Sequence, residues 1–195
     1  GASYPLVLTP SAEEDRSALR PQEPKKPYPY QVEEVRFVNP TDGGTLAGTL
    51  TMPTSPGPHR AVVMITGSGP QDRDESLMNH KPFLVWSDAL TKLGIAVLRF
   101  DDRGVGASTG NFSKATTADF ARDVEAAVDY LRSRKEIDNQ RIGLIGHSEG
   151  GIIAPMVAVS RPKDVSFIVL LAAPGLRGEH LAHAERGDLP AFSYA

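Results

Sequence analysis

Four continuous apolar runs divide the central and C-terminal parts of the chain into segments of alternating character. The runs lie at residues 61–65, 95–98, 142–145 and 165–171, and their lack of polar alternation predicts strands buried on both faces. The segments between them carry apolar residues at helical spacing. Strands that alternate with amphipathic helices predict an α/β fold with a mostly parallel central sheet and helices on both faces.

Three helices are expected between these runs. The first is predicted from the stripe Phe83, Trp86, Leu90 and Leu93, which stops at Gly94. The second begins at Thr116, where Asp119 completes a capping box, and its stripe consists of Phe120, Val124, Ala127, Val128 and Leu131. The third covers residues 149–160, where Pro155 removes a backbone hydrogen bond and is expected to kink the axis.

The N-terminal part predicts an antiparallel hairpin that follows an extended arm. Val35 and Phe37 alternate with polar residues, residues 42–44 form an Asp-Gly-Gly turn, and alternation resumes at Leu46. The preceding residues are rich in proline and have no sustained period. We therefore expect an extended arm, an α/β core and an irregular tail, at residues 1–31, 32–178 and 179–195.

Composition excludes several function classes. The 195 residues are 40% hydrophobic and carry a net charge of −3, and no basic run is interleaved with aromatic residues, which argues against a nucleic-acid partner. Cysteine is absent, so a Cys nucleophile, a disulfide and a thiolate metal site are excluded. No apolar run approaches the roughly 18 residues that span a bilayer. The start without Met at Gly1 favours a soluble chain whose leader was removed, and the compartment stays open.

The strongest chemical signal is the Gly-His-Ser-Glu-Gly sequence at residues 146–150, which matches G-x-S-x-G between a predicted strand and a predicted helix. This context predicts that Ser148 is a nucleophile in a tight strand-to-helix turn. Side chains at Gly146 and Gly150 would collide with neighbouring elements in such a turn. The Glu149 amide, at the start of the helix, is then expected to donate to an oxyanion. The alternative is a glycine-rich turn that holds an ordinary serine.

A second oxyanion donor is expected in the glycine-rich loop at residues 66–70, at the C-terminal end of the first buried strand. The Ser68 amide is the first choice and the Gly69 amide the second. An ordinary strand-ending turn is the alternative for this loop.

Three motifs carry a resemblance to a known family: GSGPQDRDES at residues 67–76, FDDRGVGAST at 100–109 and IGHSEGG at 145–151. In this order and spacing, the chain resembles the bacterial α/β-hydrolases called serine-aminopeptidase-like or dienelactone-hydrolase-like over roughly residues 32–178. The resemblance implies a partial α/β-hydrolase fold that hydrolyses carboxyl esters through an acyl-enzyme, with the residues named above as nucleophile and oxyanion donors. Relatives of this kind often carry export signals, which is the one indication of a periplasmic or extracellular location.

The acid and histidine of a catalytic triad are harder to place. In this fold they follow the nucleophile, each after a further βα unit of roughly 30 residues, and such units do not fit in the chain after Ser148. We expect His147 to turn away from the Ser148 hydroxyl. The remaining candidates have weaknesses of their own: Asp164 precedes a strand, whereas three residues, His180, His183 and Asp188, lie in the tail.

The other polar motifs are interpreted as structural and not as catalytic or ligand-binding. The Asp-Asp-Arg-Gly sequence at residues 101–104 is expected to form turn hydrogen bonds and ion pairs. The nearby glycines do not match a dinucleotide or phosphate-binding motif. The H-x-x-H at residues 180–183 is a weak metal signal, so no metal and no cofactor are predicted.

The sequence thus favours a serine hydrolase that acts on small-molecule esters of small acyl groups, without a membrane span. Two alternatives stay open. In the first alternative, the chain is a catalytically incomplete fragment that associates through the exposed edge of its last strand, as a homodimer or with a complementing C-terminal chain. In the second, it is a peptidase of the same fold.

Overall fold

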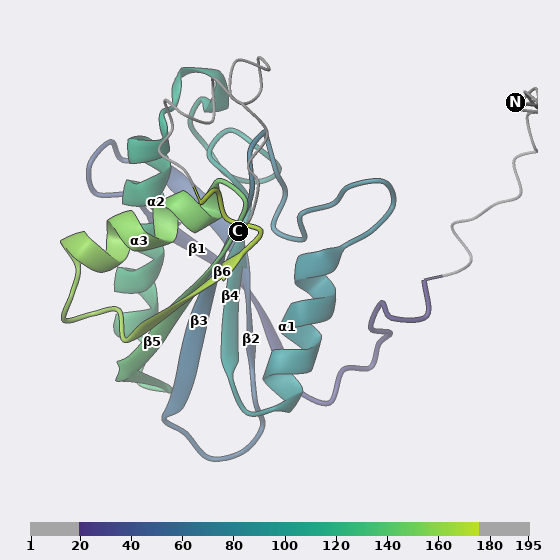
Figure 1. Ribbon diagram of the computed structural model, residues 1–195. Coiled ribbons are helices and arrows are strands. Elements are labelled where there is room, and N and C mark those ends of the chain that lie inside the picture. Colours follow the sequence, from purple (N-terminus) through teal and green to yellow (C-terminus); the bar gives the residue numbers. More distant parts are fainter. Residues whose placement is uncertain (1–19, 176–195) are drawn as a thin grey trace, which may run out of the picture.

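The structure, a computed structural model, describes residues 20–175 and contains one twisted six-stranded sheet (Figure 1). The strands are β1 (Gln31–Val38), β2 (Thr45–Met52), β3 (His59–Ile65), β4 (Ala96–Phe100), β5 (Ile137–His147) and β6 (Phe167–Leu171). Their order is β1-β2-β4-β3-β5-β6. The pairs of β4 with β3, β3 with β5 and β5 with β6 are parallel, whereas β1 and β2 are antiparallel to their neighbours. The predicted mostly parallel sheet and N-terminal hairpin are confirmed.

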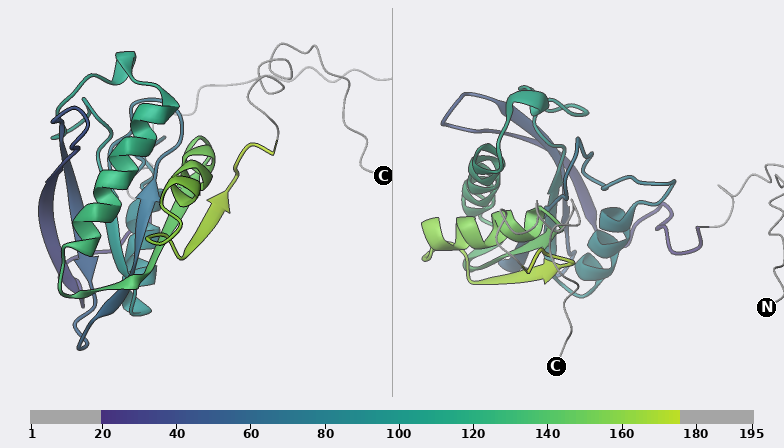
Figure 2. Two further views of the ribbon diagram at one scale, coloured as in Figure 1. Left: turned by 90° about the vertical axis from the view of Figure 1, so that its left-hand side faces the viewer. Right: turned by 45° about the horizontal axis from the view of Figure 1, so that its top comes forward.

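Helices cover both faces of the sheet, as predicted. Helix α1 (Pro82–Lys92) packs on one face, against β2 and β4. Helices α2 (Thr117–Arg132) and α3 (Gly150–Ser160) lie side by side on the other face, as both views of Figure 2 show. A short 3-10 helix, η2 (Phe112–Lys114), precedes α2. Each face of the sheet therefore has its own layer of core side chains.

The face that α1 presents to the sheet differs from the expectation. Phe83 is buried, but Trp86 and Leu93 are 45% and 77% exposed. Two polar residues are buried instead, because the Thr51 hydroxyl of β2 forms hydrogen bonds with the hydroxyls of Ser87 (3.0 Å) and Thr91 (2.7 Å). Satisfied hydroxyls can enter a core, so a stripe defined by apolar residues alone misses them.

Several element bounds also differ from the expected ones. Strand β5 begins five residues early, at Ile137, because this residue pairs with His59 before an irregularity in the ladder. Strand β6 begins two residues late, at Phe167. Residues 20–30 form only turns and bends before β1, and the proposed arm up to residue 19 and the whole of the proposed tail lie outside the described residues. The three-part division of the chain stays a prediction.

The predicted capping box at the start of α2 is present: the Thr116 amide donates to Asp119 Oδ2 at 2.9 Å, and the Thr116 hydroxyl accepts from the Asp119 amide. We expect Thr116→Ala to lower the free energy of unfolding by about 1 kcal/mol, because a first-turn amide loses its acceptor. Urea denaturation measures this change. Ser113→Ala removes a nearby exposed hydroxyl that caps no helix and serves as the control. Equal stability of the two variants would contradict the prediction.

Candidate active site

Ser148 occupies a strained turn between β5, which ends at His147, and α3, which begins at Gly150. Its φ is +51°, a left-handed conformation that residues with a Cβ rarely adopt. Hydrogen bonds hold both sides of the turn: the Ser148 amide donates to Leu171 O of β6, and Ser148 O accepts from the Gly151 amide, both at 2.9 Å. The serine is half-buried at the carboxyl end of β5.

Two glycines allow this turn to pack closely. An added Cβ at Gly146 would lie 2.0 Å from the Gly150 carbonyl oxygen, and one at Gly150 would lie 2.3 Å from the carbonyl oxygen of Ile65 in β3. Both obstacles are backbone atoms, which cannot rotate away as a flexible side chain can. The start of α3 is therefore pressed against the end of β3, as a tight elbow requires.

The loop that follows β3 runs past Ser148. A Cβ at Gly67 would lie 3.2 Å from Ser148 Cβ, so the Gly67 backbone lies close to the Ser148 side chain. Within residues 20–175, the amides of Ser68, Gly69 and Glu149 have no hydrogen-bond acceptor in range, whereas the Gly67 amide is occupied. The predicted donors thus come from the loop that contains Gly67 and from the residue that follows Ser148, and their role as oxyanion donors stays a prediction.

Three consecutive charged residues fix the remainder of this loop, and sequence reasoning missed them. Arg73 forms a bidentate ion pair with Asp101 at the end of β4, at 3.0 and 2.8 Å, and Asp74 pairs with the buried Arg99. Burial opposes ionisation of Asp101, but the hydrogen bonds and charge of Arg73 together with the hydrogen bond from the Ala107 amide outweigh it and hold the pKa of that carboxyl below its usual value. Glu75 binds the Gly67 amide. The run of charges directly after a glycine-rich loop was the available signal.

Asp102 anchors the first half of the loop. Its carboxylate accepts from the Thr66 hydroxyl at 2.8 Å and from the Gln71 amide at 2.9 Å, at the two ends of the glycine-rich segment. Burial raises the pKa of Asp102 to about 6, and the nearby charges of Asp123 and Glu149 add to the effect. The expected structural role of residues 101–104 is confirmed, and Arg103 contributes through an ion pair with Asp123 at 2.7 Å.

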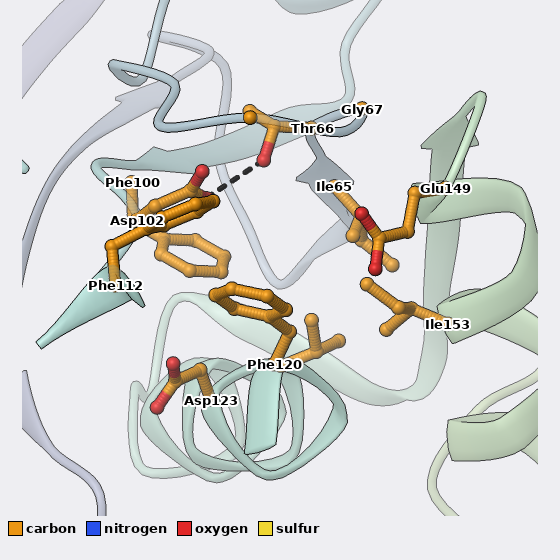
Figure 3. A pocket seen from close by; sticks show the side chains of 12 residues that line it. Ile65, Thr66, Gly67, Phe100, Asp102, Phe112, Phe120, Asp123, Glu149 and Ile153 are labelled. Atoms are coloured by element: carbon orange, nitrogen blue, oxygen red, sulfur yellow. Dashed lines mark hydrogen bonds between the residues drawn. The ribbon is translucent and has the colours of Figure 1, made fainter. Parts of the chain in front are cut away.

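A pocket opens between this loop, α2 and the start of α3 (Figure 3). Its lining includes Gly67, Gly69 and Glu149 together with three aromatic rings, those of Phe100, Phe112 and Phe120. Glu149 extends into it, and the Glu149 carboxylate accepts from the Thr117 hydroxyl at 2.8 Å. The lining also carries the carboxylates of Asp102, Asp123 and Glu149, so the pocket has a mixed polar and aromatic wall, and Ser148 is not among its lining residues. Ser68 is exposed.

The described residues hold no base for Ser148. Across residues 20–175 its hydroxyl has no hydrogen bond to another residue, and Nδ1 of the adjacent His147 lies 2.7 Å from Glu75 Oε1. Asp164 lies before β6, where it pairs with Arg132 and Arg161, far along the strand from the elbow. The other candidates, His180, His183 and Asp188, lie outside the described residues.

No group of three or more His, Asp or Glu side chains in residues 20–175 is arranged to hold a metal ion. None of the described helices is long and apolar enough to cross a bilayer.

Comparisons with known proteins agree on one family. The sequence profile of the family described as serine aminopeptidase, S33, matches residues 83–187. Esterase EstD of Thermotoga maritima is 33% identical over 129 residues, which cover 66% of this chain and 30% of the esterase. The human mitochondrial palmitoyl-protein thioesterase ABHD10 is 30% identical over 142 residues, covering 73% of this chain and 41% of the thioesterase. The chain thus spans less than half the length of these two relatives.

The fold is shared with solved structures. Est1E from Butyrivibrio proteoclasticus, solved with ferulic acid, superimposes with a TM-score of 0.64 and 22% identity, over 83% of this chain and 60% of Est1E. This likeness concerns the fold alone. Together with the sheet order and the helices on both faces, it confirms a partial α/β-hydrolase fold.

The raised pKa of Asp102 predicts a pH-dependent stability. A folded pKa of about 6 against an ordinary 3.8 means that the fold favours the protonated carboxyl, so stability from this group is highest below about pH 4 and falls as pH rises through 6. Relative to Asp102→Asn, which cannot ionise, the wild type should lose on the order of 3 kcal/mol between about pH 4 and pH 7. Urea denaturation of both proteins over this range measures it. A difference that does not change with pH would contradict the assignment.

Proposed function

From the premise that the chain belongs to the serine aminopeptidase S33 family of α/β-hydrolases, we propose that it hydrolyses carboxylic esters of small acyl groups through an acyl-enzyme on Ser148. The observation that carries the proposal is the left-handed Ser148 between β5 and α3, with the glycine-rich loop against it. Relatives whose names denote an esterase and a thioesterase support acyl transfer from oxygen or sulfur.

In the proposed reaction, Ser148 Oγ attacks the ester carbonyl carbon while a base takes its proton. The carbonyl oxygen becomes an oxyanion, which accepts hydrogen bonds from the Glu149 amide and from Ser68 or Gly69. The amide end of α3 adds its positive dipole. The bond from the acyl carbon to the alcohol oxygen then breaks, the alcohol leaves with a proton, and water hydrolyses the acyl-enzyme to free Ser148.

The base is assigned outside residues 20–175. A serine hydroxyl is a weak nucleophile without one, and no described histidine is bonded to Ser148. We assign this role to a histidine in the remainder of the chain or in a complementing C-terminal chain. The alternative of an incomplete fragment that associates through β6 draws on the exposure of Phe167, Val169 and Leu170 on that strand. Light scattering after gel filtration tests it, since a strict monomer excludes edge pairing.

The pocket beside Glu149 is proposed as the acyl site. Aromatic rings line it, and it shares Gly67, Gly69 and Glu149 with the two segments that are proposed to donate to the oxyanion, which supports this assignment. A peptidase is the second candidate, because the family's description is an aminopeptidase. Rates on p-nitrophenyl butyrate and on amino-acid p-nitroanilides distinguish the two, and we expect the ester to be the faster substrate by at least about 100-fold.

Ser148→Ala should abolish hydrolysis of p-nitrophenyl butyrate and labelling by a fluorophosphonate probe, because both need the hydroxyl as nucleophile. The loss of rate should be at least about 1,000-fold. Intact-protein mass spectrometry of the natural full-length protein measures the labelling. The control is Ser166→Ala, a serine hydroxyl bonded to Ile142 O at the far end of β6. Undiminished labelling of Ser148→Ala would reject the proposed nucleophile.

A further inference from the structure

Glu75 stands out among the loop carboxylates because it is buried beside the elbow. Only 6% of the residue is exposed, and its φ is +53°, a strained conformation for a residue with a side chain. One oxygen, Oε1, accepts from the Gly67 amide at 2.8 Å and lies 2.7 Å from His147 Nδ1. A carboxylate oxygen only accepts, so Nδ1 is the donor in this contact.

These two hydrogen bonds join the glycine-rich loop after β3 to the turn at Ser148. In the proposed reaction, these two segments lie on either side of the ester carbonyl. Gly67 immediately precedes Ser68, the first-choice oxyanion donor, and His147 immediately precedes Ser148. The same three groups crowd together, since a Cβ at Gly67 would lie 3.2 Å from His147 Nδ1 and 3.3 Å from Glu75 Oε1. A single buried oxygen thus sets the distance between the glycine-rich loop and the strand-to-helix turn.

We propose that Glu75 is a positioning residue, which holds the oxyanion loop in register with Ser148 by binding the Gly67 amide and the His147 ring together. The inference rests on the proposed function. With the Gly67 N–H held by Glu75, the Thr66–Gly67 peptide plane is fixed, and so is the Gly67 Cα from which the peptide that carries the Ser68 N–H starts. His147 is thereby explained as part of the scaffold: its Nδ1 contacts Glu75, and within the described residues its ring has no hydrogen bond to the Ser148 hydroxyl.

The charged residues that precede Glu75 in the loop form other contacts and do not bind the turn at Ser148. Arg73 and Asp74 pair with Asp101 and Arg99, which tie the loop to β4. Asp72 accepts from the Asp74 and Ser76 amides at 3.0 Å and thus shapes the loop internally. Within the described residues, Glu75 is the member of this charged run that contacts the elbow. Loss of Asp72 therefore reports on loop stability alone, and loss of Glu75 also reports on the register of the site.

The positioning role predicts a change in kcat with little change in KM. Oxyanion donors stabilise charge that develops in the transition state. A misdirected Ser68 amide therefore raises the free energy of the transition state and leaves the affinity for the ester unchanged. In the natural full-length protein, Glu75→Ala should lower kcat on p-nitrophenyl butyrate about 100-fold, with KM within about twofold of the wild type. The inhibition constant of a trifluoromethyl ketone, which forms a tetrahedral adduct with serine, should rise by the same factor.

Two variants separate positioning from folding. Glu75→Gln keeps an oxygen that can accept both hydrogen bonds, so its kcat should stay within about tenfold of the wild type. Asp72→Asn should leave kcat close to that of the wild type. Should Glu75→Ala not fold, Glu75→Asp, which is one methylene shorter and cannot span both contacts, replaces it with the same expectation.

The inference is overturned if Glu75→Ala keeps the wild-type kcat, if KM alone changes, or if Asp72→Asn lowers kcat as much as Glu75→Ala does. Fluorophosphonate labelling separates this failure from that of the proposed function. An inactive and unlabelled Ser148→Ala beside a fully active Glu75→Ala rejects only the positioning role. Hydrolysis that persists in Ser148→Ala rejects the function on which it rests.

Discussion

The close contact between the first turn of α3 and the end of β3 is the constraint on which the site depends. At Gly150 the two backbones approach so closely that no side chain fits, and Gly146 meets the same turn from the other side. A chain that must turn from strand to helix in this space places Ser148 at a positive φ. The parallel sheet holds Ser148 in this strained conformation, because β5 is hydrogen-bonded on one side to β3 and on the other to β6.

Buried carboxylates fix the shape of the glycine-rich loop after β3. A glycine-rich loop has little conformational preference of its own, so its shape has to come from elsewhere. Asp102 holds the loop at Thr66 and Gln71, Asp101 holds it through Arg73, and Glu75 holds the amide of Gly67. The free energy of ionisation differs between these carboxylates. Asp101 is stabilised in its charged form by Arg73, whereas ionised Asp102 is disfavoured by burial. Precise placement of the loop is thus obtained at some expense in stability, as is common at functional sites.

The sequence predicted those features that short-range patterns control. Apolar runs located β3 to β6 to within a few residues, the glycines marked the turn at Ser148, and the capping box of α2 began at Thr116 as expected. The errors arose where distant residues decide. The buried face of α1 depends on Thr51 of β2, which satisfies Ser87 and Thr91, and the early start of β5 depends on pairing with His59. The contact of Glu75 with His147 was missed because it joins residues 72 positions apart.

In the proposed reaction, Ser148 carries the acyl group during turnover. Rapid acid quenching of the natural full-length protein with p-nitrophenyl butyrate, followed by trypsin and mass spectrometry, detects such an intermediate. We expect the tryptic peptide of residues 142–163, which contains Ser148, to gain the mass of one butyryl group, with the modification on that serine. Steady ester hydrolysis with this peptide unmodified, or with the butyryl group on another residue, would contradict it.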